Sequence, residues 1–227
     1  MRTALFTFKT LFLTLWMLLL ATAAVADENY ATAADIKPGR FQIYLQSNEM
    51  LANLNQVGRF WDKLLGLQQA CQEQYAIKPV NLIILAPVVF PDAAQYPTAG
   101  IWRVQFEYNR CKDLKTYNAI FTAKDGGTPE LLPAIPGYSD ASPALALDAM
   151  RAVTPQVQAQ LGKAGAKDCK QIYPFDARMT PTAVARPRDQ SWQEKWTFQG
   201  CGKQVVFLMT FNPQAPDGNF FSGTPLH

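Results

Sequence analysis

One carboxylate of this sequence stands among aromatic residues on a predicted strand. In "SWQEKWTFQGC", Glu194 shares an alternating face with three aromatic residues, Trp192, Trp196 and Phe198. A carboxyl group among aromatic rings is expected to have a raised pKa, which suits a general acid. The alternative interpretation is a strand-end residue that reaches water or pairs with a nearby cation. Hydrolysis by paired carboxylates needs a second acid, and the sequence shows none that clearly faces Glu194.

Other catalytic chemistries have less support. The single histidine is His227, the last residue, and an unpacked terminus is a poor place for a catalytic imidazole. The segment "GYSDA" has alanine where a nucleophile elbow has glycine, so Ser139 and Asp140 are interpreted as turn and capping residues. The sequence contains no phosphate-cradling G-x-x-x-x-G-K and no C-x-x-C pair. We therefore expect no metal site and no cofactor.

The four cysteines belong to an internal similarity that needs no gap. A shift of ninety residues sets Cys111 on Cys201 and Trp102 on Trp192, and it aligns four further aromatic pairs. The other two cysteines, Cys71 and Cys169, each precede a tyrosine by four residues. If the halves are alike, the bridges are Cys71–Cys111 and Cys169–Cys201, although four cysteines allow other pairings. Each bridge would close a loop of roughly 30–40 residues and contribute up to about 4 kcal/mol.

Three tryptophans, Trp102, Trp192 and Trp196, are candidates for a ligand-binding platform. They lie on alternating apolar faces, however, and such rows usually form the core between a sheet and a helix. Polar residues at aligned positions mostly differ, as in Gln105 against Lys195. A duplicated site would repeat its chemistry, so the similarity is interpreted as duplicated scaffold.

The elements that position these residues occur in the same order twice. The sequence predicts an α+β fold made of two α-β-β-β units with antiparallel sheets, each stapled by a disulfide. We expect a signal peptide over 1–26, a flexible lead-in over 27–40, a first repeat over 41–128, a linker over 129–141 and a second repeat over 142–227.

Within these units the patterns predict particular elements. Residues 41–45 are interpreted as a short strand, and a helix capped by Ser47 or Asn48 is expected to reach Cys71. A second helix follows the cap at Ser142, with Pro155 as a kink or break.

The N-terminal segment has the features of an export signal. Arg2 and Lys9 precede the apolar run "LFLTLWMLLLA", and small residues allow cleavage after Ala26. The apolar run is too short to span a bilayer of about 30 Å, so we expect no membrane insertion after cleavage. Residues 27–227 carry 19 basic and 18 acidic residues, because Arg2 and Lys9 are the only charged residues before them. This near-neutral balance gives no reason to expect nucleic acid or anionic lipid as a partner.

The pattern W-x-x-x-[aromatic]-x-[aromatic]-x-x-C before a hairpin resembles one in uncharacterised exported proteins of Gram-negative bacteria. The resemblance covers mainly residues 169–224, together with their counterpart in the first half. It implies a periplasmic location and transfers no active-site residues to this chain.

The sequence therefore favours a soluble periplasmic protein without catalysis that binds another protein or an envelope component. Recognition is expected on the variable polar face and on two proline-rich loops, at 86–96 and 174–188, because loops on a rigid frame often carry binding. The alternative is a carboxylate-dependent hydrolase of a glycan or ester substrate that uses Glu194.

Overall fold

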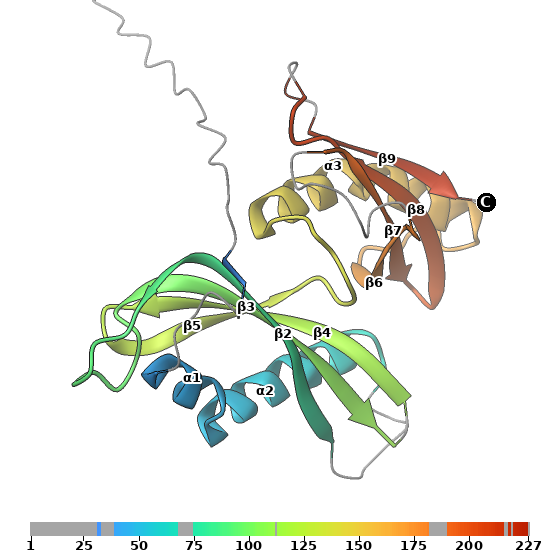
Figure 1. The fold of residues 1–227 in the computed structure, drawn as a ribbon. Coiled ribbons are helices and arrows are strands. Elements are labelled where there is room, and N and C mark those ends of the chain that lie inside the picture. The colour runs from blue at the N-terminus through green and yellow to red at the C-terminus, as the bar shows by residue number, and fades with distance from the viewer. Residues whose placement is uncertain are drawn as a thin grey trace, which may run out of the picture.

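The computed structural model describes residues 31–32, 39–67, 75–111, 113–181, 190–215, 218 and 220–226. The expected signal peptide, at 1–26, and Cys71 lie outside these ranges. The described residues form two α+β units in chain order, each with its helices packed against an antiparallel sheet (Figure 1). This confirms the predicted fold class and the antiparallel sheets.

The first unit consists of α1 Arg40–Leu45, α2 Asn48–Leu64, β1 Ala31–Thr32, β2 Ala76–Val89, β3 Ala99–Arg110, β4 Asp113–Lys124 and β5 Gly127–Ala134. Its sheet has the order β1-β2-β3-β4-β5, and every neighbouring pair is antiparallel. The side chain of Ser47 caps α2 by accepting a hydrogen bond from the Met50 N–H at 3.1 Å.

Two predictions about this unit are wrong. Residues 41–45 form helix α1 instead of a strand, because Phe41 and Tyr44 are buried at helical spacing while Ile43 is 71 % exposed. Helix α2 ends at Leu64 and does not continue toward Cys71. Gly66 follows it with a φ of 71°, a left-handed conformation that favours glycine and ends helices.

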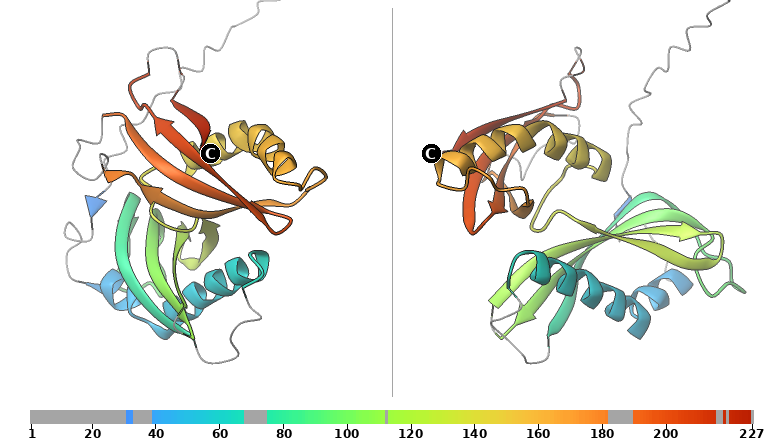
Figure 2. Two further views of the ribbon diagram at one scale, coloured as in Figure 1. Left: turned by 90° about the vertical axis from the view of Figure 1, so that its right-hand side faces the viewer. Right: turned by 180° about the vertical axis from the view of Figure 1, so that it is seen from behind.

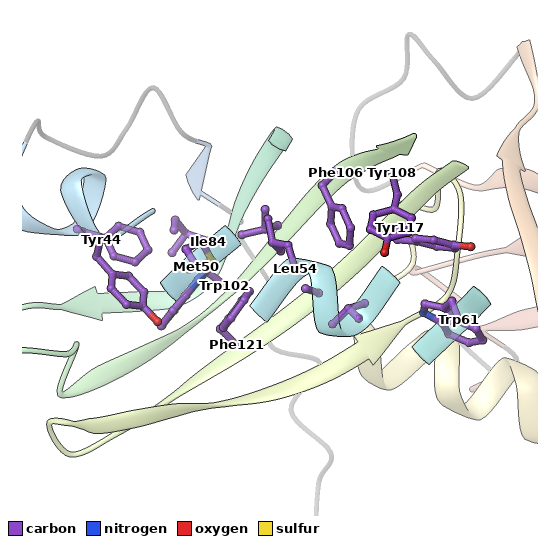
Figure 3. Packing of buried hydrophobic residues seen from close by; sticks show 14 of the residues in the cluster. Tyr44, Met50, Leu54, Trp61, Ile84, Trp102, Phe106, Tyr108, Tyr117 and Phe121 are labelled. Atoms are coloured by element: carbon purple, nitrogen blue, oxygen red, sulfur yellow. The ribbon is translucent and has the colours of Figure 1, made fainter. Parts of the chain in front are cut away.

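The first core lies between α2 and the inner face of β3 and β4 (Figure 3). The buried residues include Met50, Leu54, Val57, Trp61, Trp102, Phe106, Tyr108, Tyr117 and Phe121. The alternation of β3 places its aromatic residues on this inner face, as the sequence predicts.

The second unit consists of α3 Pro143–Lys163, β6 Ile172–Met179, β7 Trp192–Gly200, β8 Lys203–Phe211 and β9 Phe221–Leu226. Its sheet has the order β6-β7-β8-β9. The buried face of α3 packs on the aromatic face of the sheet and forms a separate core. Helix α3 runs through Pro155 without ending there. Burial of Val153 and Val157 on either side of the proline stabilises the continuous helix.

The first unit has two more strands than the predicted three, β1 and β5, and the second unit has one more, β9. Strand β5 occupies part of the segment expected as a linker over 129–141, and β9 is its counterpart in the second sheet. Pro129 and Pro133 argued against a strand in the sequence, because proline has no backbone N–H to donate to a neighbouring strand. On an edge strand, prolines spaced by four residues can direct their missing donors away from the sheet.

The two central hairpins have the same register. Trp102 pairs with Phe121 and stacks on it at 5.5 Å between ring centroids, and Trp192 pairs with Phe211 and stacks at 4.8 Å. Both hairpins turn at a cysteine with positive φ, 43° at Cys111 and 49° at Cys201.

The second unit contains the predicted disulfide between Cys169 and Cys201, with a Cα–Cα distance of 5.7 Å. Cys111 is also disulfide-bonded, but its expected partner Cys71 lies outside the described residues. The pairing in the first unit therefore remains a prediction.

The units meet at the face of the first sheet that is opposite α2. Figure 2 shows α2 on one side of this sheet and the second unit on the other. Residues 135–142 connect β5 to α3 and pass through this junction.

Candidate functional site: a buried carboxylate at the junction

Glu194 lies in the middle of the aromatic row of β7. Because side chains alternate along a strand, Trp192, Glu194 and Trp196 all point toward α3. The Glu194 side chain is fully buried, at 0 % exposure. The indole N–H of Trp192 donates to Oε1 at 2.7 Å, and that of Trp196 donates to Oε2 at 2.6 Å. The strand thus supplies one indole donor to each carboxylate oxygen.

A third donor reaches Glu194 from the connection between the units. The backbone N–H of Asp140 donates to Oε1 at 2.9 Å. Carboxylate oxygens accept hydrogen bonds, so three N–H donors suit the two oxygens of Glu194. The bond also fixes the connecting segment on the second sheet just before Ser142, which caps α3 by accepting a bond from the Leu145 N–H at 3.2 Å.

The same carboxylate explains a difference between the two aligned rows. In the first unit Val104 stands in the place of Glu194, and the Trp102 indole nitrogen is buried without a hydrogen-bond partner in the described residues. In the second unit both indoles have an acceptor. The W-x-E-x-W spacing contains this information, since an acceptor two residues from each indole lies on the same strand face. The sequence suggested Glu194 as an acid, and the structure shows it as an acceptor.

Asp140 is the acidic residue that the fold brings next to Glu194. The backbone N–H of Asp140 contacts the Glu194 carboxylate. Asp140 is exposed, whereas Glu194 is buried. Two catalytic carboxyl groups must reach the same scissile bond of a bound substrate. The partners that the structure gives Glu194 are N–H groups, and its side chain is fully buried. This geometry holds the connecting segment in place.

Arg103 adds a positive charge to this junction from the outer face of β3. Burial lowers the pKa of its guanidinium, and the negative charges of Asp140 and Glu194 oppose that shift. Its Nε atom is buried without a hydrogen-bond partner among the residues that the structure describes. Arg103 therefore supplies charge compensation across the junction.

The connecting segment is held most closely at Gly137. Its N–H donates to the Thr116 carbonyl oxygen of β4 at 2.8 Å. Its carbonyl oxygen accepts from the side-chain amides of Gln105, at 3.1 Å, and Asn118, at 2.9 Å. Gln105 and Asn118 are both buried, because this part of the outer face of the first sheet is covered by the connecting segment.

The second unit holds the other side of the same segment. Gly137 forms a parallel bridge with Ala177 of β6, whose N–H donates to Pro136 at 2.9 Å and whose carbonyl oxygen accepts from Tyr138 at 2.7 Å. Gly137 has a φ of 93°, and a Cβ atom there would overlap the Ala177 backbone. The segment at 136–138 thus covers the β6 edge and links the two sheets.

A second polar cluster, which was not predicted from the sequence, lies between α2 and the turn end of β3. Tyr117 donates to Asp62 Oδ1 at 2.6 Å, and the Nε atom of Arg110 lies 3.1 Å from Oδ2. Arg110 also donates to Asp113 at 2.6 Å. The Asp62 to Arg110 contact is an ion pair without hydrogen-bond alignment, since both of these atoms lack a hydrogen-bond partner in the described residues.

The charges of this cluster are compensated inside the protein. Burial raises the pKa of Asp62, while the Tyr117 hydroxyl and the Arg110 charge lower it in part. Two sequence signals pointed here: Asp62 lies on the apolar face of the helix, and Arg110 continues the buried alternation of β3. The cluster joins helix to sheet: Asp62 and Arg110 are buried, and the Asp113 side chain at its edge is 58 % exposed.

The candidate binding tryptophans are core residues. Trp102 and Trp196 are 0 % exposed and Trp192 is 7 % exposed. The fold brings Trp192 and Trp196 together around Glu194 and keeps Trp102 in the core of the other unit. None of the three presents a ring face to solvent.

The first proline-rich loop, at 86–96, is anchored at its ends and exposed in its middle. Phe90 and Tyr96 pack against the first core beside Tyr44, and the Tyr96 hydroxyl donates to Glu49 at 3.2 Å. Residues 91–93 between them are exposed. The second loop, at 174–188, lies largely within β6 and in residues outside the described ranges.

Comparison with known proteins adds no family or fold relative: no family model, no curated protein and no solved structure matches this chain. In the described part of the chain, no helix has the length and apolar character needed to cross a membrane. The same residues contain no group of three or more potential metal ligands.

Proposed function

We propose that this chain is an exported scaffold of two related units that binds another protein or an envelope component without catalysing a reaction. One observation carries the proposal. Glu194, the carboxylate best suited to catalysis by sequence, is fully buried, and N–H donors occupy both of its oxygens. Its role is to hold the junction, so the hydrolase alternative loses its general acid.

The proposal includes a duplicated origin for the two units. The shared helix-then-meander order, the identical hairpin register and the cysteine turns all support it. It also includes a Cys71–Cys111 bridge equivalent to Cys169–Cys201, a signal peptide cleaved after Ala26, and a periplasmic location. Disulfide formation in the second unit agrees with an oxidising compartment.

The outer face of the second sheet is the main candidate for recognition. On the first sheet, Gln105 and Asn118 already serve the junction. On the second, Gln193, Lys195 and Thr197 of β7 lie on the face opposite the core, with Lys195 exposed. Gln199, farther along the same face, donates to the Leu65 carbonyl oxygen of the first unit at 3.1 Å, so the candidate region is the part of this face around Lys195.

Cross-linking in the export compartment, followed by purification and mass spectrometry, tests this proposal. We expect one reproducible partner or envelope component whose recovery falls when Lys195 is changed to Glu. The control is Lys78→Glu on β2, which is 75 % exposed and makes a surface ion pair with Glu107. Recovery of no reproducible partner or ligand would contradict the proposal, and hydrolysis of a glycan or ester lost in Glu194→Gln would establish the alternative.

A further inference from the structure

The second unit carries an uncompensated group of lysines at the end where α3 terminates. The lysine end, as we name it, consists of Lys163, Lys167, Lys170 and Lys203. All four are exposed, and none forms an ion pair within the described ranges. The net charge of residues 27–227 is close to zero, so it did not indicate this local positive charge.

The fold brings these lysines together from three segments. Lys163 is the last residue of α3, and Lys167 folds back on the helix, with its Cα atom 3.7 Å from the Cβ position of Gly162. Lys170 adjoins Cys169, whose disulfide reaches the β7–β8 turn that contains Lys203. Lys203 pairs with Gly200, where an added Cβ would lie 2.9 Å from the Cys169 sulfur. The disulfide therefore fixes the loop lysines beside the turn lysine.

At the equivalent end of the first unit, the charge of one arginine is neutralised by two acids. Arg110 and Asp113 occupy the positions aligned with Gly200 and Lys203, and Arg110 is buried between Asp62 and Asp113. In the second unit the aligned residues are Gly200 and Lys203, so neither the buried arginine nor the acid is present. Asp168 is the one acidic residue in the segment 163–170. Lysines near a helix C-terminus interact favourably with the helix dipole. That interaction does not explain the positions of Lys170 and Lys203, which lie outside the helix.

An apolar side chain accompanies the lysines at this end. Leu226, the last residue of β9, is 40 % exposed and pairs with Val206, three residues after Lys203. Figure 1 shows α3 and β9 terminating on the same side of the second unit. Flexible lysines around an exposed aliphatic residue suit a surface of anionic headgroups above an acyl region, because lysine stems cover apolar surface while their ammonium groups stay hydrated.

We propose that the lysine end docks the protein on an anionic phospholipid surface of the envelope. The inference rests on the export included in the proposed function, and it adds phosphate-bearing lipid headgroups as a contact separate from the Lys195 face. Docking is peripheral and electrostatic. Each lysine near such a surface strengthens binding by about fivefold, so removal of four is expected to weaken it by up to about 600-fold.

Vesicle co-sedimentation tests the docking with the chain purified from the export compartment, after mass spectrometry has identified its N-terminus. The probes are vesicles of phosphatidylcholine alone and of equal parts phosphatidylcholine and phosphatidylglycerol. We expect binding only to the mixed vesicles, and its loss between about 0.1 M and about 1 M salt, where the Debye length falls from about 10 Å to about 3 Å.

Two variants with the same change in net charge locate the effect. The test variant replaces all four residues of the lysine end by Gln. The matched control replaces four exposed cationic residues elsewhere by Gln, namely Lys63, Lys78, Lys124 and Arg151. We expect at least a tenfold weakening for the test variant and less than threefold for the control, with circular dichroism spectra of both unchanged.

Three results would overturn the docking: no binding to mixed vesicles, equal weakening in both variants, or undiminished binding of the test variant. Retention on isolated peptidoglycan without vesicle binding would assign the lysines to a glycan and also overturn it. Each result leaves the cross-linking test of the proposed function unaffected. An N-terminus other than Asp27 would contradict the expected cleavage site, whatever the vesicles show.

Discussion

The contacts of Gly137 at the junction between the units allow the effect of Gly137→Ala on the free energy of unfolding to be predicted. This residue and Gly165 both have a φ of 93°, so a Cβ atom introduces comparable backbone strain at both, about 1–3 kcal/mol. Around Gly165 no atom lies within 4 Å of the added Cβ, whereas at Gly137 the Cβ overlaps the Ala177 backbone and meets Asp176 Oδ1 at 2.5 Å. Gly165→Ala is therefore a control that has the strain without the steric overlap.

Relief of the overlap at Gly137 requires the connecting segment to move. That movement breaks the bonds from Gln105 and Asn118 to the Gly137 carbonyl oxygen, and both amides are buried. An unsatisfied buried polar group costs about 1–3 kcal/mol. With strain and both amides included, we expect Gly137→Ala to lower the free energy of unfolding by about 3–9 kcal/mol, against about 1–3 kcal/mol for Gly165→Ala.

Urea unfolding followed by tryptophan fluorescence and circular dichroism measures both losses. Limited proteolysis should also cut Gly137→Ala between the units at a protease concentration that leaves Gly165→Ala intact. Equal losses for the two variants would refute the claim that the segment at 136–138 is fixed between the sheets.

Two further predictions concern the cores. Burial raises the pKa of Asp62, so its carboxyl group stabilises the fold most when it is protonated. The usual pKa of an unfolded aspartate is about 4. As pH rises above this value, the free energy of unfolding of the unchanged protein should therefore fall relative to that of Asp62→Asn. Urea midpoints across a pH series measure this difference, and a difference that rises with pH would show that Arg110 dominates. Replacing Cys169 and Cys201 by Ala opens a crosslink with a sequence separation of 32 and should cost about 2–4 kcal/mol, whereas an unchanged melting temperature under matched conditions would exclude a stabilising role.

Much of the scaffold could be predicted because its signals are local. The alternation of β3 and β7 identified the strands, and the ninety-residue shift correctly placed Cys169 with Cys201. Strands β5 and β9 were missed because edge strands tolerate proline and glycine, which read as turns in the sequence. Helix α1 was missed because its buried residues, Phe41 and Tyr44, fit strand chemistry while their spacing is helical.

The candidate site was less predictable because it depends on contacts between distant segments. The sequence placed Glu194 correctly on the aromatic face, but its third donor comes from Asp140, 54 residues earlier. The role of Gly137 depends on Thr116 and Ala177, which belong to different units. No periodicity within one strand contains such information, since it arises only when the two sheets meet.

The central claim is that Glu194 is a structural acceptor, and the free energy of unfolding of Glu194→Gln tests it most directly. The amide keeps the volume but turns a donor group toward an indole N–H, so the account predicts a loss of about 2–4 kcal/mol. The control Glu107→Gln, in a surface ion pair with Lys78, should change stability by less than about 1 kcal/mol. Catalytic carboxylates often reduce stability, so an unchanged or increased free energy of unfolding for Glu194→Gln would contradict the account and return Glu194 to the candidates for catalysis.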